Sequence, residues 1–169
     1  MSPRMIPKNY TPLALMAADA DDLSVVSAVL QDAVAKVGDL VFLPRARRFA
    51  LVANRFVWEE GATKAHGPFS RVRTGLHFDD VRAVRTLNLD LQNKAAVVDI
   101  LSLAFEETED GAGTITITLA GGGAVALDVE AINVTVEDIS APWRTQSRPD
   151  HDGTQGKTQS AASSPVGAV

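Results

Sequence analysis

Apolar residues that recur at every second position constrain this chain more than any other feature of its sequence. Phe49, Leu51 and Ala53 follow this period, and residues 114–119 alternate threonine with isoleucine and end on leucine. Residues 132–136 continue with the same spacing. A period of two places alternate side chains on one face of a β-strand. The sequence therefore predicts a chain built mostly from one sheet.

Turn signals divide the alternating regions into separate strands. The expected strands cover residues 48–58, 71–78, 81–89, 97–105, 114–119 and 125–129. A short strand and a basic turn at residues 44–47 precede the first of them. In the 97–105 strand we expect Leu101, Leu103 and Phe105 to share one face. Residues 133–139 are compatible either with a last strand or with a short helix.

One helix is expected before the sheet, over residues 21–37. Asp19 precedes it, and its carboxylate is suited to accept hydrogen bonds from the free N–H groups of the first turn. The apolar stripe, with the three-then-four spacing of a helix face, consists of Leu23, Val26, Leu30, Ala33, Val34 and Val37. Gly38 follows the stripe, and glycine supplies the left-handed conformation that commonly ends a helix.

These elements predict a single α+β domain in which the N-terminal helix packs on a curved, mostly antiparallel sheet of seven to nine strands. We expect the domain to cover residues 12–144, with a flexible arm at 1–11 and a disordered tail at 145–169. Apolar residues occur at positions 76, 78 and 81, and the same spacing, again starting from a leucine, occurs at positions 127, 129 and 132. A duplicated β unit would explain this echo, and a partly closed barrel is a further alternative.

Composition excludes several classes of protein. The chain has no cysteine, so disulfides and thiolate chemistry are excluded. The apolar run at residues 13–18 is far too short to span a bilayer. We therefore expect a cytoplasmic protein that does not bind membranes.

The net charge of −5 is unevenly distributed along the chain. Residues 41–90 contain nine Arg or Lys against five acids, whereas residues 95–140 contain nine acids and no base. We expect separate cationic and anionic regions. They either bind partners, attract each other, or simply solvate the strands that carry them.

An arginine cluster is the first functional candidate. It consists of Arg45, Arg47, Arg48, Arg55, Arg71 and Arg73, with the last three expected on one exposed sheet face. Arginine suits bidentate binding of phosphate or carboxylate. The leading hypothesis is a non-catalytic binding module that uses this basic hairpin face to bind an acidic protein, a phosphorylated ligand, or the acidic half of a second copy in a homo-oligomer.

A small hydrolase-like enzyme centred on His77 and Asp79 is the alternative, and weak nucleic-acid binding is the third hypothesis. Two ligands on one strand are too few for a zinc site, so no metal is expected. Residues 111–113 and 121–123 are glycine-rich, but strands rather than helices follow them. They predict hairpin turns and not phosphate loops, and no cofactor is indicated.

The chain resembles a family of small uncharacterised alphaproteobacterial proteins, domain of unknown function 2948. The residues that carry the resemblance are the helix at 21–37, Gly38-Asp39-Leu40, Leu43-Pro44, residues 48–52 and 54–56, Leu76-His77-Phe78-Asp79, residues 120–123, and Pro142-Trp143. The resemblance covers most of residues 12–143. It implies no activity and no residue roles.

Overall fold

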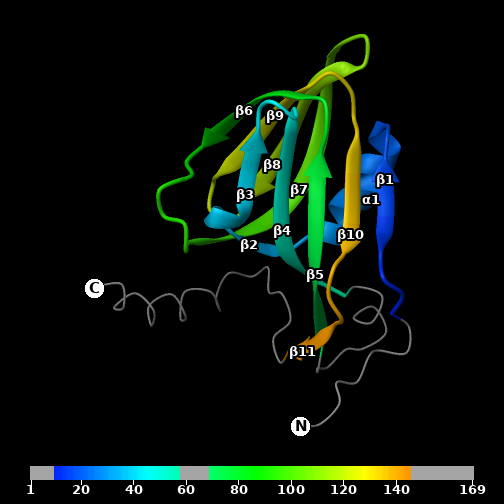
Figure 1. Cartoon of the computed structure of the whole chain (residues 1–169), viewed down its shortest axis with the longest axis vertical. Helices are drawn as coiled ribbons and strands as arrows, with labels where there is room; N and C mark the ends of the chain where they lie inside the picture. The colour runs from blue at the N-terminus through cyan, green and yellow to red at the C-terminus, as the bar shows by residue number, and fades with distance from the viewer. Residues whose placement is uncertain (1–9, 58–68, 146–169) are drawn as a thin grey trace.

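The computed structural model of this protein describes residues 10–57 and 69–145. Within them, one α-helix packs against an 11-stranded antiparallel sheet that is not closed into a barrel (Figure 1). The predicted fold class is therefore confirmed. The sheet has more strands than expected partly because two of them contain only three residues, too few to show a period of two.

The elements follow one another in this order: β1 (Ala14–Ala17), α1 (Ala20–Leu30), β2 (Val34–Lys36), a 3-10 turn (Val37–Asp39), β3 (Leu40–Leu43), β4 (Arg48–Phe56), β5 (Phe69–Phe78), β6 (Val81–Leu87), β7 (Val97–Glu109), β8 (Ala112–Leu119), β9 (Ala124–Val129), β10 (Val134–Asp138) and β11 (Trp143–Thr145).

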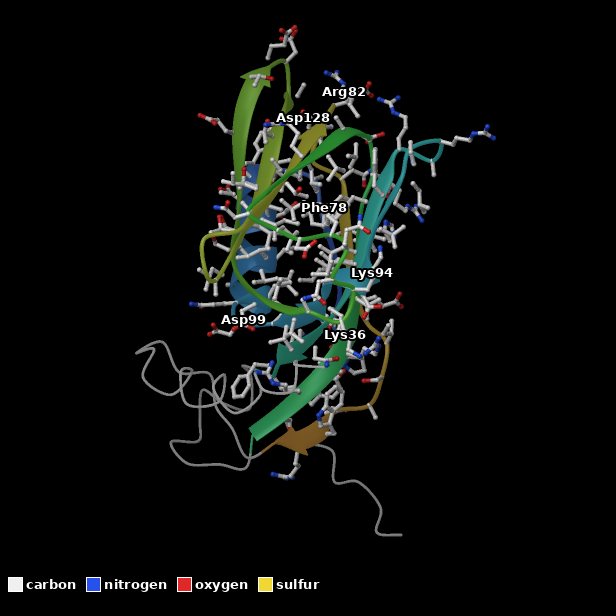
Figure 2. All side chains as sticks on the ribbon, turned by 90° about the vertical axis from the view of Figure 1, so that its left-hand side faces the viewer. Lys36, Phe78, Arg82, Lys94, Asp99 and Asp128 are labelled. Atoms are coloured by element: carbon white, nitrogen blue, oxygen red, sulfur yellow. The ribbon has the colours of Figure 1, made fainter. Side chains whose placement is uncertain are left out.

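The sheet runs in the order β1-β10-β5-β4-β2-β7-β8-β9-β6, with β3 beside β4 and β11 beside β5. The short strand β2 joins its two halves, since it pairs with β4 and with β7. Figure 1 shows β4, β5 and β10 side by side with β7, β8 and β9 behind them. The sheet thus curves into two layers, and Phe78 lies between them (Figure 2).

In most strands, alternate side chains point into the space between the two layers. Phe49 and Phe78 are 3% and 0% exposed, and their ring centroids lie 6.2 Å apart. Leu23, Val26 and Leu30 of α1 are buried as well, and the helix packs against β7, β1 and β4. Burial of each such side chain contributes about 1.5–3 kcal/mol.

The helix ends earlier than predicted. Its start is confirmed, because Asp19 Oδ1 accepts a hydrogen bond from the Asp22 N–H at 2.8 Å. The predicted end at residue 37 is wrong: α1 ends at Leu30, and Asp32 adopts a φ of 66°. Residues 34–36 pair with β4 and β7 instead. The apolar pattern of these residues fits either a helix or a strand, and the pairing with two neighbouring strands favours the strand. Gly38 lies in the 3-10 turn.

Strand β7 also differs from the prediction. Its pairing with β8 shifts between Ile100 and Ser102, which is the mark of a β-bulge. A bulge reverses which residues face the core, so Leu103 is buried whereas Leu101 is 41% exposed. The strand is also longer than predicted, because β7 continues past residue 105 to Glu109.

The open question at residues 133–139 is answered by β10, which is a strand. The turn at residues 44–47 lies between β3 and β4 as predicted. Most of the predicted arm and tail falls outside the described residues. The domain limits and the duplication stay predictions.

Candidate ligand-binding groove

The six arginines of the predicted basic face do not form one surface. Arg45, Arg47 and Arg48 surround the turn between β3 and β4. Arg71 and Arg73 pair with residues at the opposite end of β4. A separation of six to eight residues along a strand corresponds to roughly 20–26 Å. The structure therefore divides the cluster into two groups.

Arg55 is an internal residue. Its side chain is 1% exposed and that of Asp138 is 0% exposed. Two Arg55 nitrogens donate to the Asp138 carboxylate, each at 2.9 Å, and the same carboxylate accepts from Thr74 Oγ1 and the Leu13 N–H. The prediction that Arg55 lies on an exposed face is wrong, because its position in β4 has the parity of the core. Burial acts to raise the pKa of Asp138, but these hydrogen bonds lower it below its ordinary value.

Arg71 is held by the protein's own groups. Its guanidinium lies 5.8 Å from the centre of the Phe56 ring and donates to the Asn54 carbonyl at 3.1 Å. Burial lowers the pKa of Arg71, against the opposing charges of Asp99 and Asp32. These contacts assign Arg71 a structural role.

Ion pairs connect the basic and acidic segments. Arg47 and Arg82 contact Glu130, and Arg85 contacts Asp128. Arg82 and Asp128 lie at the same end of the molecule in Figure 2. The expectation of separate charged regions is wrong at this end, because β6 pairs with β9 and brings opposite charges together. The interpretation that the two segments attract each other fits these contacts.

A groove of about 490 Å³ crosses the outer face of β3, β4, β5 and β10. Its floor contains the small residues Ala50, Val52 and Gly75. Leu43 of β3 and Ile139, just beyond β10, form apolar walls and are 45% and 53% exposed. The groove thus presents apolar surface on the face of the sheet that points away from the core.

Gly75 deepens this groove without serving the packing of the protein. A Cβ atom at this position would meet only Ile139 atoms, at 3.9 Å, which is ordinary contact. Glycine in the interior of a strand costs stability and often marks a place where a ligand approaches closely. The absent side chain leaves the middle of the floor open.

One end of the groove is basic. Arg48 Nε donates to Asp79 Oδ1 at 2.7 Å, and His77 Nδ1 lies 3.0 Å from Asp79 Oδ2. Burial acts to raise the pKa of Asp79, but the hydrogen bonds to Arg48 and His77 lower it below its ordinary value. Among the described residues, the terminal nitrogens of Arg48 and Nε2 of His77 have no hydrogen-bond partner, and both side chains line the groove.

Within residues 10–57 and 69–145, no three His, Cys, Asp or Glu side chains converge as metal ligands would. In the same residues no helix has the length and hydropathy to cross a bilayer.

The family model described as protein of unknown function DUF2948 matches residues 13–151. The chain belongs to the DUF2948 family. No curated protein and no solved structure matches it. The groove and the Arg55–Asp138 pair both lie in the segment that the DUF2948 model matches. The family description names no activity, so the groove is the feature of this chain that bears on its function.

The apolar groove is the part of this DUF2948 protein that the sequence reasoning missed. Its signal is present in β3 and β4, where apolar residues occupy both parities: Val41 and Leu43 face outward, and so do Ala50 and Val52. In an antiparallel sheet with one solvated face, the outward row is normally polar. Strands that are apolar on both faces therefore predict a second apolar surface besides the core.

Proposed function

We propose that this protein is a non-catalytic binding module, and that its ligand is a small anion with an apolar body bound in the groove of β3, β4, β5 and β10. The observation that carries the proposal is the environment of the Arg48 guanidinium. Asp79 engages its Nε, and its terminal nitrogens are left without an acceptor among the described residues at the end of an apolar floor.

The chemistry of Arg48 fits this role. Because one carboxylate already orients the guanidinium, its outer nitrogens form a fixed pair of donors for a carboxylate or phosphate. The groove volume of about 490 Å³ lies in the range of small-molecule sites. The floor then contributes apolar burial, while Arg48 sets the orientation. Of the six candidate arginines, Arg48 is the binding residue in this proposal, because Arg47 pairs with Glu130 and neither Arg45 nor Arg47 lines the groove.

Calorimetric titration with octanoate, an alkyl chain with one carboxylate, tests the proposal. We expect saturable binding, and Arg48→Gln lowers the affinity by about tenfold because a charge-assisted hydrogen bond is lost. Arg85→Gln is the matched control, since it removes another exposed arginine that is paired with an aspartate but does not line the groove. Equal affinities of Arg48→Gln and the wild type would contradict the proposal.

A hydrolase is the second candidate, favoured by the 3.0 Å contact between His77 Nδ1 and Asp79 Oδ2. A carboxylate at Nδ1 orients the imidazole so that Nε2 acts as a general base. Nε2 would take a proton from water, the hydroxide would attack an ester carbonyl carbon, and the proton would pass to the departing alkoxide. Turnover of p-nitrophenyl butyrate that His77→Gln abolishes, with octanoate binding retained, would favour this candidate. No difference in turnover would remove it.

Three further expectations stay predictions. Nucleic-acid binding has less support, since Arg47, Arg82 and Arg85 contact carboxylates. It requires an affinity that falls steeply with salt, so unretarded short RNA and DNA at low salt would discard it. Cell fractionation tests the cytoplasmic location, and sedimentation tests a homo-oligomer.

A further inference from the structure

The groove has a negative wall as well as a basic end. Glu137 projects from the outer face of β10 and lines the groove beside Gly75, its partner in the register. In the part of the chain that the structure describes, its carboxylate has no hydrogen bond and no ion pair. Asp39, on the opposite wall, lies 3.9 Å from Arg73 and so has a cation nearby. Glu137 is thus the groove carboxylate that a ligand can neutralise.

From this arrangement we propose that the ligand is a zwitterion, a short apolar peptide whose carboxylate binds Arg48 and whose ammonium group binds Glu137. The inference rests on the proposed function, and it adds the second charge of the ligand and its length.

The register sets that length. Glu137 pairs with Gly75, and Gly75 pairs with Val52, so Glu137 lies two strands from β4. Arg48 lies four residues before Val52. With strands about 4.8 Å apart and about 3.3 Å per residue, the Cα atoms of Glu137 and Arg48 are roughly 16 Å apart. Side chains stand roughly perpendicular to a sheet, so their charged ends are about as far apart as the Cα atoms. A charge-assisted hydrogen bond of about 2.8 Å at each end leaves roughly 10 Å, which an extended tripeptide spans.

The free carboxylate also argues against a ligand with only one charge. An apolar body that covered Glu137 would remove water from an ionised group and offer no hydrogen bond in return, which costs binding free energy. An ammonium group placed there restores the lost interactions. Binding of a simple anion is accordingly weaker than binding of a matched zwitterion.

The test uses leucyl-alanyl-leucine in four forms: with free termini, N-acetylated, C-amidated, and blocked at both ends. Calorimetry measures the affinity of each form for the full chain. We expect the free peptide to bind about tenfold more tightly than either singly blocked form. Glu137→Gln removes the advantage of the free amine but not that of the free carboxylate, and Arg48→Gln does the reverse. Glu106→Gln, which lies outside the groove on β7, changes neither.

The outcomes separate this inference from the proposed function. If the N-acetylated peptide binds as tightly as the free peptide, while Arg48→Gln still weakens both, the zwitterion is overturned and the anion site stands. If all four forms fail to bind while octanoate binds, the peptide is overturned and the groove stands. If octanoate fails as well, both proposals are overturned. Thermal melting of each variant shows that loss of binding is not loss of the fold.

Discussion

The guanidinium of Arg55 and the carboxylate of Asp138 meet in two hydrogen bonds of 2.9 Å, with both side chains almost fully enclosed. The pair links β4 to β10 across β5. Thr74 of β5 donates to the same carboxylate, and so do Tyr10 and Leu13 at the start of the described chain. This network connects the strands that carry the groove, and it makes the groove depend on one buried charge pair.

Loss of one member of this pair should destabilise the protein strongly. Asp138→Ala leaves the Arg55 guanidinium buried without its counter-charge, so we expect the free energy of unfolding to fall by about 3–5 kcal/mol. The double variant Arg55→Met with Asp138→Leu removes both charges and should lose less than Asp138→Ala alone. Urea unfolding measures all three proteins. A loss below about 1 kcal/mol for Asp138→Ala would show that the pair is not important for stability.

Acid should destabilise the protein. The pKa values of Asp79, Asp128, Glu130 and Asp138 lie below their ordinary values. A lowered pKa in the folded state gives stability that is complete above the unfolded value of about 4 and is lost as the pH falls through the folded value. Asp99 has the opposite effect on the pH dependence of stability, because burial raises its pKa.

Urea unfolding at a series of pH values tests this prediction. We expect the free energy of unfolding to decrease from about pH 5 toward pH 2, and Asp79→Asn to make that decrease shallower. A wild-type curve that is flat over this interval would contradict the role of the ion pairs.

The same substitution should destabilise the protein at one glycine and leave its stability almost unchanged at another. At Gly113 a Cβ would lie 2.2 Å from the Glu106 carbonyl oxygen and 2.8 Å from the Glu107 Cα, so backbone must move. We expect Gly113→Ala to lower the free energy of unfolding by about 2 kcal/mol or more. Gly75→Ala is the matched control, and we expect a change within about 0.5 kcal/mol. Equal effects of the two variants would refute the assignment of Gly75 as dispensable for packing.

Filling the groove should abolish binding and leave the fold intact. Gly75→Val adds a β-branched side chain at a strand position where a Cβ makes only ordinary contact with Ile139, and such residues suit strands. We expect unchanged or higher thermal stability and no measurable octanoate binding. A Gly75→Val protein that binds octanoate like the wild type would place the ligand elsewhere.

The sequence was sufficient to predict the parts of the fold that local periodicity determines. Asp19 at the helix start and the β3–β4 hairpin were predicted because their signals lie within a few residues of chain. The helix end was not, since residues 34–37 continue a helical stripe while equally suiting a strand, and pairing with β4 and β7 decides between the two.

The candidate site could be predicted less well than the fold, because it depends more on contacts between residues far apart in the sequence. Arg55 shares the core parity of Phe49, Leu51 and Ala53, but its buried partner Asp138 lies 83 residues further along the chain. The groove needs small residues on two strands and walls from two others, a coincidence that only the register produces. His77 and Asp79 were predicted as neighbours because they are only two residues apart in the sequence, at the end of β5.

Amide chemical-shift mapping of the ¹⁵N-labelled full chain with octanoate shows where on the protein an apolar anion binds. We expect the largest changes at residues of the groove floor and walls, such as Ala50, Gly75 and Thr135, and we expect Arg48→Gln to reduce them. Changes centred on the ion-paired end around Arg82 and Asp128, or no changes at all, would contradict it.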